Sequence, residues 1–286
     1  MKSHATVRRV TSFLLLGVLL LGTAFAAGCN KKTSNDQAGQ TALSGTLTIA
    51  GSTSVQPFSE VLAEKFMEKN KGVQVNVQGG GSSVGIEAAI SGAAGLGSSS
   101  RDLKPEEKAK NLVDTKIALD GIAIVVHPEN TVKALKTEDV MNIYLGNIKN
   151  WKELGGPDAP ITVVSREDGS GTREAFTTLV MNKKDIVKNA IIQNSTGAVR
   201  TTVAGDKNAL GYVSLSSLNK DIKALDIDGA AATEANVKAG TYKLQRPFIY
   251  VTKDAPTGLA KAFIDFVLSA EGQKMIVDEG AISINK

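Results

Sequence analysis

The sequence is poor in the residues on which many catalytic and metal sites depend. Its 286 residues include one cysteine, Cys29, and two histidines, His4 and His127. A single cysteine cannot form a disulfide within the chain. A zinc site needs more cysteine and histidine ligands than these. The chain must therefore fold on its apolar core, and we expect neither a metal nor a cofactor.

The first 28 residues have the composition of an export signal. A basic start is followed by a short apolar segment and small residues, and Cys29 comes directly after them. This order is typical of a secretory signal, and the apolar segment is short for a transmembrane span. It resembles a bacterial lipoprotein signal, in which Cys29 is lipidated and becomes the mature N-terminus, although Ala26 stands where leucine is usual. An ordinary signal peptide with a chance cysteine is the alternative.

Removal of this segment changes the charge balance. Residues 1–28 carry Lys2, Arg8 and Arg9 and no acidic residue, so the formal net charge falls by three, from +4 to +1. The remaining chain has no long basic block, and nucleic acid is therefore not an expected partner. Residues 29–44 are small and polar, which predicts a flexible tether.

From residue 45 onward, apolar runs alternate with helical patterns. This order favours an α/β fold with largely parallel sheets. The spacing of apolar residues predicts strands over 46–50, 73–78, 121–128, 209–214 and 248–253, and helices over 58–70, 85–92, 137–146, 170–181 and 255–280.

Four loops that follow predicted strands have one composition in common. They are rich in glycine and hydroxyl side chains and lie at 50–58, 78–85, 97–103 and 163–176. The carboxyl ends of strands in open α/β sheets meet at the ligand site, and helix starts bind anions well. Arg166 would add a bidentate charge. The loops lack the Walker and dinucleotide patterns. They predict an oxyanion site, and ordinary helix capping is the alternative reading of each loop.

The sequence resembles a known family over nearly all of residues 46–286. The resemblance is carried by the segments LTIAGSTSVQPF, VQGGGSSVGI, GSSSRDL, SREDGSGTREAF, LGYVS, RPFIYVTK and FVLSAEGQ. Together they are similar to the phosphate-binding proteins of bacterial phosphate ABC transporters. This implies a two-lobed type II periplasmic-binding fold with the ligand between the lobes. Chain crossings are expected near His127-Pro128 and Arg246-Pro247, so that residues 45–127 and 246–286 form lobe I and 128–245 form lobe II.

The resemblance also implies a set of ligand-binding residues. The family's contacts fall on loops that match its motifs, and Asp168 would be the partner of Arg166 in the second shell. The implied contacts are Thr53, Ser54, Ser82, Ser100, Arg166, Ser170, Gly171 and Thr172.

The third loop departs from the family pattern. Well-known members have an aspartate there, which accepts the proton of bound phosphate, whereas this sequence has Ser100 followed by Arg101. Sulfate carries no such proton, so a site that prefers phosphate needs an ionised acceptor for it; otherwise sulfate fits about as well. Asp120 is our candidate for the acceptor, with a capping or turn role as the alternative. Asp102 is a poorer candidate. Arg101 is either a second ligand charge or a solvated loop residue.

The resulting hypothesis is a binding protein and not an enzyme. It would capture inorganic phosphate and, as a monomer with no cofactor, deliver it to a membrane permease driven by a cytoplasmic ATPase. It would be exported and lipid-anchored at the outer face of the cell membrane or in the periplasm. The alternatives are a carrier of another oxyanion (sulfate, molybdate or tungstate), a phosphate sensor or adhesin without transport, and a serine-dependent phosphatase. The last lacks a histidine base near the predicted site.

Overall fold

The computed structural model describes residues 43–285. The expected signal peptide, Cys29 and nearly all of the expected tether lie outside these residues. The first strand begins at Ser44, one residue before the predicted start of the folded part. None of the helices in the described range combines the length and the apolar character that crossing a bilayer requires.

The first part of the chain, which we call lobe I, is built from strands that alternate with helices. The central strand β1 pairs in parallel with both β2 and β3, as the alternating pattern predicted. The strands are β1 (Ser44–Gly51), β2 (Gly72–Gly79) and β3 (Leu96–Ser99), and the helices that follow them are α1 (Gln56–Lys69), α2 (Ser82–Ser91) and α3 (Pro105–Lys108).

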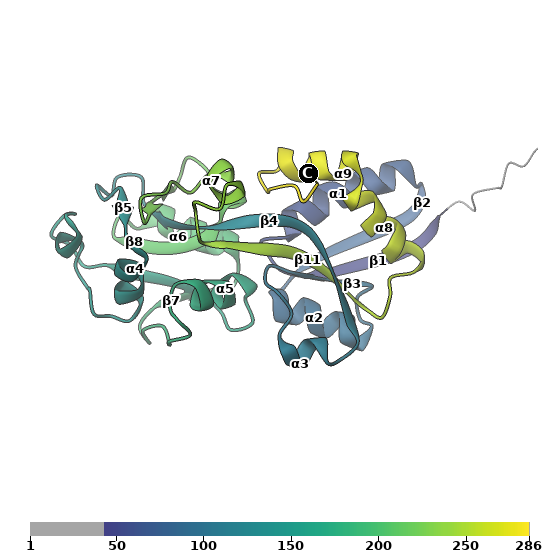
Figure 1. Ribbon diagram of the computed structural model, residues 1–286, viewed down its shortest axis with the longest axis horizontal. Coiled ribbons are helices and arrows are strands. Elements are labelled where there is room, and N and C mark those ends of the chain that lie inside the picture. The colour runs from purple at the N-terminus through teal and green to yellow at the C-terminus, as the bar shows by residue number, and fades with distance from the viewer. Residues whose placement is uncertain (1–42, 286) are drawn as a thin grey trace, which may run out of the picture. The chain divides into compact units, whose positions relative to one another are not determined.

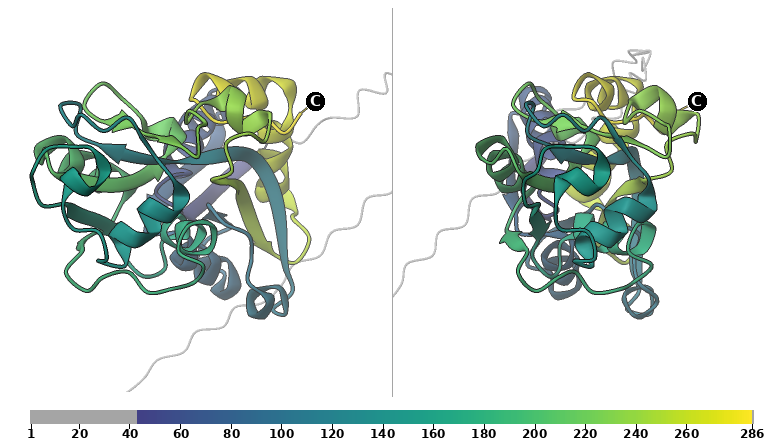
Figure 2. Two further views of the ribbon diagram at one scale, coloured as in Figure 1. Left: turned by 60° about the vertical axis from the view of Figure 1, so that its left-hand side comes forward. Right: turned by 90° about the vertical axis from the view of Figure 1, so that its left-hand side faces the viewer.

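The end of the chain completes lobe I. Strand β11 (Gln245–Lys253) pairs antiparallel with β3, and the helices α8 (Gly258–Leu268) and α9 (Ala270–Asp278) pack against α1. Figures 1 and 2 show α8 and α9, in yellow, beside α1. Phe248 and Tyr250 join the core under these helices, and the alternate residues Ile249 and Val251 join the core under α2. The sheet of lobe I is therefore covered on both faces.

Two long strands connect lobe I with the rest of the chain (Figure 1). Strand β4 (Leu112–Val126) pairs with β11 as far as Gly121, and from Ile122 onward it pairs with β8. The partner thus changes at Gly121, six residues before the expected crossing at His127-Pro128. The apolar run after Gly121 was expected to belong to lobe I, but it is a buried strand of lobe II. Strand β11 begins beside this point, with Gln245 opposite Gly121 and Arg246 opposite Asp120.

Lobe II contains the second half of the sheet and the helices that pack on it. Strand β6 pairs in parallel with β7 and β8, while β8 runs antiparallel to β4. Its strands are β5 (Ala134–Leu135), β6 (Thr162–Arg166), β7 (Ile191–Gln193), β8 (Ala209–Ser214), β9 (Lys223–Ala224) and β10 (Asp226–Ile227). Its helices are α4 (Thr137–Tyr144), α5 (Gly171–Leu179), α6 (Thr196–Gly205), α7 (Glu234–Lys238) and the 3₁₀ helices η1 (Trp151–Leu154) and η2 (Leu215–Ser217).

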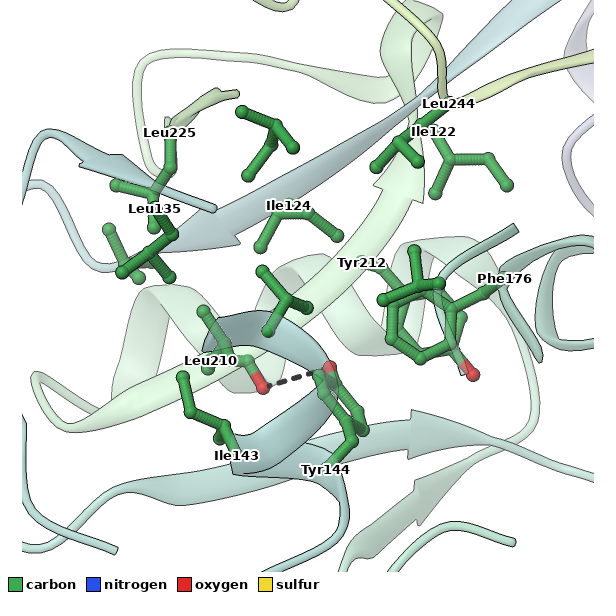
Figure 3. Close-up of a cluster of buried hydrophobic side chains, with 14 of the residues drawn as sticks. Ile122, Ile124, Leu135, Ile143, Tyr144, Phe176, Leu210, Tyr212, Leu225 and Leu244 are labelled. Atoms are coloured by element: carbon green, nitrogen blue, oxygen red, sulfur yellow. Dashed lines mark hydrogen bonds between the residues drawn. The ribbon is translucent and has the colours of Figure 1, made fainter. Parts of the chain in front are cut away.

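An aromatic cluster holds α4 and α5 against the strands of lobe II. The rings of Phe176 and Tyr212 stack with centroids 4.1 Å apart, and Tyr144 packs beside both. Figure 3 shows the stacked pair and the buried Tyr144 hydroxyl near Leu210. This hydroxyl also donates to the carbonyl of Val164 at 2.9 Å. The cluster fixes the positions of β6 and α5, between which the predicted anion loop lies.

The single helix predicted over 255–280 is wrong, because two helices occupy this range. Ser269 has an extended backbone (ψ 163°) and its Oγ accepts a hydrogen bond from the amide of Gly272, which makes it the N-cap of α9. Serine favours such a cap over a helix interior. The apolar period of the segment continues across the break because both helices pack on the same core.

Candidate functional site

Three loops of lobe I bring buried serines to the edge of the sheet that faces lobe II. Ser54 precedes α1, Ser82 opens α2, and Ser100 follows β3, and the exposed fraction of each is 1% or less. Gly85 explains how α2 lies so close to the strands. A Cβ at this position would stand 2.4 Å from the carbonyl oxygen of Ala50, so only glycine fits.

The fourth loop lies between β6 and α5 in lobe II. Arg166 ends β6, and Ser170 is the N-cap of α5 through a hydrogen bond of 3.3 Å from the amide of Arg173. Gly169, at φ 83°, takes the left-handed turn that this change of direction requires. Gly171 and Thr172 then form the first turn of the helix. The capping reading of this motif is therefore correct, and it is compatible with anion binding.

Hydroxyl groups from the two lobes meet directly. The Oγ of Ser54 lies 3.0 Å from Oγ1 of Thr172 and 2.9 Å from Oγ1 of Thr196. Thr53 joins them, because its Oγ1 accepts from the amide of Thr196 at 3.2 Å. Gly171 approaches lobe I as closely, since a Cβ there would stand 2.1 Å from Oγ of Ser82. Thr196 was not predicted from the sequence, because its segment, NSTG, has no charged residue and no glycine-rich pattern.

These contacts bring four helix starts to one place. α1, α2, α5 and α6 begin at Gln56, Ser82, Gly171 and Thr196, within or next to the residues just described. The amide groups of a helix's first turn have no partner within the helix, and the helix dipole makes this end positive. The boundary between the lobes is therefore favourable for negative charge even before side-chain charges are considered.

Arg166 is buried and held in one orientation. Its Nε and Nη2 donate to the two carboxylate oxygens of Glu167 at 2.8 and 2.7 Å, and its Nη1 donates to Oγ1 of Thr196 at 3.1 Å. The backbone amide of Arg166 is bound to the hydroxyl of Tyr212 at 3.3 Å. Burial raises the pKa of Tyr212 to about 12, so this hydroxyl keeps its proton at neutral pH. The aromatic cluster of lobe II thus supports the arginine.

The predicted role of Asp168 as the partner of Arg166 is wrong. The side chain of Asp168 is 96% exposed and lies 3.0 Å from Nη1 of Arg173. Glu167, its neighbour, makes the bidentate contact instead. The reason is the turn itself, which directs residue 167 toward the arginine and residue 168 toward solvent.

A second buried arginine, Arg246, reaches the same hydroxyls. Its Nη1 donates to Oγ1 of Thr172 at 2.7 Å and its Nη2 to Oγ of Ser54 at 3.2 Å. Nη1 also lies 3.3 Å from the carbonyl oxygen of Ser100. From the sequence, this position was predicted only as a chain crossing. The signal that could have identified Arg246 is its pairing with Asp120. The two residues carry opposite charges and face each other in the register of β4 and β11.

Asp120 is fully buried and binds this second arginine. Its Oδ2 accepts from Nε of Arg246 at 3.0 Å, and its Oδ1 accepts from Oγ of Ser214 at 2.7 Å. Burial raises the pKa of Asp120 and lowers that of Arg246, while their ion pair opposes both shifts. No hydrogen bond joins Asp120 to the hydroxyls of Ser54, Thr172 or Thr196 in the described structure. The guanidinium of Arg246 contacts Ser54 and Thr172, and that of Arg166 contacts Thr196.

The solvated-loop alternative for Arg101 is wrong. The side chain is only 6% exposed, so it is not a solvated loop residue. Its Nη1 and Nη2 donate to the two carboxylate oxygens of Glu107 at 2.7 and 2.8 Å, and its Nε lies 2.8 Å from Oε2 of Glu174. The guanidinium of Arg101 thus contacts Glu107, Glu174 and Ser83, and these contacts lie outside the hydroxyl cluster.

The groups that converge at the lobe boundary are hydrogen-bond donors and cations, which are the groups that favour an oxyanion. Within residues 43–285, no three side chains of histidine, cysteine, aspartate or glutamate come together as metal ligands would. Two guanidinium groups, hydroxyls from both lobes and four helix starts converge instead. Each arginine is already paired with a carboxylate, which keeps it fixed in place.

Comparison with known proteins agrees with this geometry. A family model described as "PBP superfamily domain" matches residues 36–271. The phosphate-binding protein PstS of Bacillus subtilis is 39% identical over 283 residues, which cover 96% of this chain and 93% of that protein. The phosphate-binding protein PstS of Borreliella burgdorferi is 28% identical over 250 residues, covering 83% of this chain and 90% of that protein.

Solved structures give the same result. A putative phosphate ABC transporter substrate-binding protein from Clostridium perfringens, solved with bound phosphate, is 44% identical and has a TM-score of 0.82, covering 84% of this chain and 100% of that one. An ABC-type phosphate transport receptor from Vibrio cholerae is 38% identical, with a TM-score of 0.71 and coverage of 82% and 99%. The predicted two-lobed periplasmic-binding fold is confirmed. The chain therefore belongs to the PBP superfamily and, within it, to the family of substrate-binding proteins of phosphate ABC transporters.

Proposed function

We propose that this protein captures inorganic phosphate outside the cytoplasm and delivers it to the membrane permease of an ABC transporter, which a cytoplasmic ATPase drives. The observation that carries the proposal is the convergence of Arg166, Arg246 and hydroxyls of both lobes at four helix starts. The names of the relatives, several of which are phosphate-binding proteins, support the choice of ligand.

In this proposal the anion binds between the lobes and takes over hydrogen bonds that the hydroxyls now make with one another. Ser54 and Thr172 lie next to Arg246, and Thr196 lies next to Arg166, so each arginine is placed to share the anion with hydroxyl donors. The complete proposed set adds Arg246 and Thr196 to the residues expected from the sequence, namely Thr53, Ser54, Ser82, Ser100, Arg166, Ser170, Gly171 and Thr172.

Asp120 acts through Arg246 in this proposal, which differs from its expected role as the acceptor of the phosphate proton. Both of its oxygens already accept hydrogen bonds, from Arg246 and Ser214. Serine and threonine hydroxyls can accept as well as donate. The hydroxyl cluster, in which Ser82 and Ser100 lie 3.4 Å apart, can therefore accept the phosphate proton, but it can equally donate to sulfate and does not by itself favour phosphate.

Calorimetric titration of residues 30–286, freed of endogenous ligand, with phosphate and then sulfate at pH 7 tests this function. Tight binding of phosphate is the expected result, and the response to sulfate shows whether an ionised acceptor, and not the hydroxyl cluster alone, receives the phosphate proton. Equal binding of both would favour the alternative of a broader oxyanion carrier, with molybdate and tungstate as the next ligands. Absence of binding to any of these anions would refute the site. The Asp120→Asn variant then separates a positioning role from proton acceptance, since loss of sulfate discrimination alone would assign acceptance to Asp120.

The membrane attachment is a separate part of the proposal. Lipidation of Cys29 would tether the folded part through residues 30–42 to the outer face of the membrane that bears the permease. A Cys29→Ser variant should appear in the soluble fraction, whereas the unaltered protein should remain with the membrane. Deletion of the gene distinguishes transport from a sensor or adhesin. Phosphate uptake by the cells should fall if the protein serves transport, and it should stay unchanged if the protein is a sensor or an adhesin.

A further inference from the structure

Glu174 of lobe II contacts lobe I beside the anion site and outside it. It lies on α5, one turn from the helix start. Its Oε2 stands 2.8 Å from Nε of Arg101 and 2.9 Å from Nζ of Lys104, and its Oε1 accepts from Oγ of Ser83 at 3.4 Å. Arg101, Lys104 and Ser83 all belong to lobe I. One carboxylate of lobe II thus contacts three side chains of lobe I.

The partner on lobe I is fixed independently of Glu174. Both terminal nitrogens of Arg101 are bound to Glu107, which also accepts from the amide of Lys104 at 2.8 Å. The Nε of Arg101 is buried and has no aligned hydrogen bond within the described residues, although the oxygen of Glu174 is close to it. Among the described residues, Glu174 supplies the carboxylate within salt-bridge distance of this nitrogen. Arg101 is therefore a preformed receptor for a carboxylate that arrives from lobe II.

The contact is continuous with the site but does not include it. The amide of Ser83 donates to the carbonyl oxygen of Gly169 at 3.0 Å, across the same boundary, and Ser82 is the next residue. Apart from the pair on the crossing strands, the ion pairs of Glu174 are the salt bridges that join the two lobes among residues 43–285. A cavity of about 490 Å³ lined by Arg101, Lys104 and Glu174 gives water access to the pair from one side.

We propose that Glu174 is a positioning residue that holds the lobes together around the bound anion and slows its release. This inference rests on the proposed function, because it requires that the lobes separate when the anion leaves, as in hinge closure around ligands. The carboxylate touches no proposed ligand group, so it acts on the lifetime of the complex. Association depends on the separated lobes, in which the ion pairs are absent, and is expected to change little.

The test is the rate of phosphate release from the Glu174→Gln variant of residues 30–286, measured by stopped-flow displacement. Release should be about 5-fold faster or more, as for a coupling between a remote contact and a ligand. Association and the melting temperature of the phosphate-free protein should stay near those of the unaltered protein. Sodium chloride should speed release from the unaltered protein slightly more than from the variant, because it screens the pair of Glu174 with Lys104, whose side chain is 42% exposed.

A matched control is Asp265→Asn, which makes the same charge change in a pair with Lys261 inside α8 of lobe I. Its release rate should not change. Lys104→Gln removes one of the two cations and should give a smaller acceleration than Glu174→Gln. If the unaltered protein binds phosphate and Glu174→Gln releases it no faster, the inference is wrong and the proposed function stands. If the unaltered protein does not bind phosphate, the proposed function fails first.

Discussion

Two buried arginines reach one group of hydroxyls from different kinds of backbone. Arg166 stands at the end of a strand, and its carboxylate partner is the next residue, Glu167, whose side chain is 25% exposed. Arg246 lies within a long strand, and its partner Asp120 is 126 residues away, fully buried on the paired strand. The first pair is a local arrangement that a turn can form by itself. The second exists only after the two crossing strands have paired.

The difference has an energetic consequence. A carboxylate with access to water loses little when its partner is removed, because solvent takes over. A carboxylate without access to water is left as an unpaired buried charge, which is costly. Both arginines are placed to bind the anion, but only Arg246 is also needed to keep the connection between the lobes intact. The predictions that follow separate these two contributions.

The largest effect is expected for Arg246→Met. Phosphate affinity should fall by about 100-fold or more, since a buried charged donor is lost. The free energy of unfolding should fall by about 3–5 kcal/mol, because Asp120 is left unpaired. Calorimetry and urea denaturation measure the two quantities. The double variant Asp120→Asn/Arg246→Met is the control, and it should regain most of the stability without regaining affinity. Affinity that survives in the single variant would exclude Arg246 from the site.

For Arg166→Met we expect a similar loss of affinity with a much smaller loss of stability. Affinity should again fall by about 100-fold, whereas the free energy of unfolding should change by about 1 kcal/mol or less, because Glu167 becomes hydrated. The same two measurements apply. A stability loss equal to that of Arg246→Met would remove the distinction between the local and the long-range pair.

Gly171→Ala probes the approach of the two lobes without changing any charge. The new methyl group would meet Oγ of Ser82, which is backed by the start of α2. Phosphate affinity should fall by about 10-fold or more, as expected when overpacking costs 1–3 kcal/mol. Gly205→Ala, at the end of α6, is the control, because a Cβ there has no neighbour within 4 Å. Equal affinities of the two variants would show that lobe I does not approach Gly171 in the bound protein.

The same local and long-range division explains what the sequence could predict. The strand-to-helix loops were found because each carries its own signal of glycines and hydroxyls after an apolar run, and Ser54, Ser82, Arg166 and Thr172 lie at the lobe boundary as expected. The signals in these segments are complete within about ten residues. The parallel pairing of β1 with β2 and β3, and of β6 with β7 and β8, also follows from local patterns, since alternating strands and helices favour it.

The parts that failed depend on pairing between distant segments. Arg246 enters the site because its strand pairs with that of Asp120, and no local pattern states this register. Thr196 enters because α6 begins opposite Ser54, which only the packing of the two lobes determines. The error at Asp168 has a different cause. Residues 167 and 168 are both acidic, and the choice between them depends on the dihedral angles of a turn that composition does not specify.

The smallest effects concern these two acidic neighbours. In the structure Glu167 holds Arg166, so Glu167→Gln should weaken phosphate binding by a few-fold, at most about 10-fold, because an arginine that is less fixed loses more side-chain entropy on binding. Asp168→Asn should change affinity by less than about 2-fold, since Asp168 is exposed and its one ion pair is with Arg173. Both variants remove one negative charge from the same turn, so long-range electrostatic effects on the anion are nearly matched between them. Phosphate titrations of the two variants at the same ionic strength therefore isolate the contact with Arg166. A larger loss of affinity for Asp168→Asn than for Glu167→Gln would mean that the turn rearranges when the anion binds, so that Asp168 replaces Glu167 as the partner of Arg166.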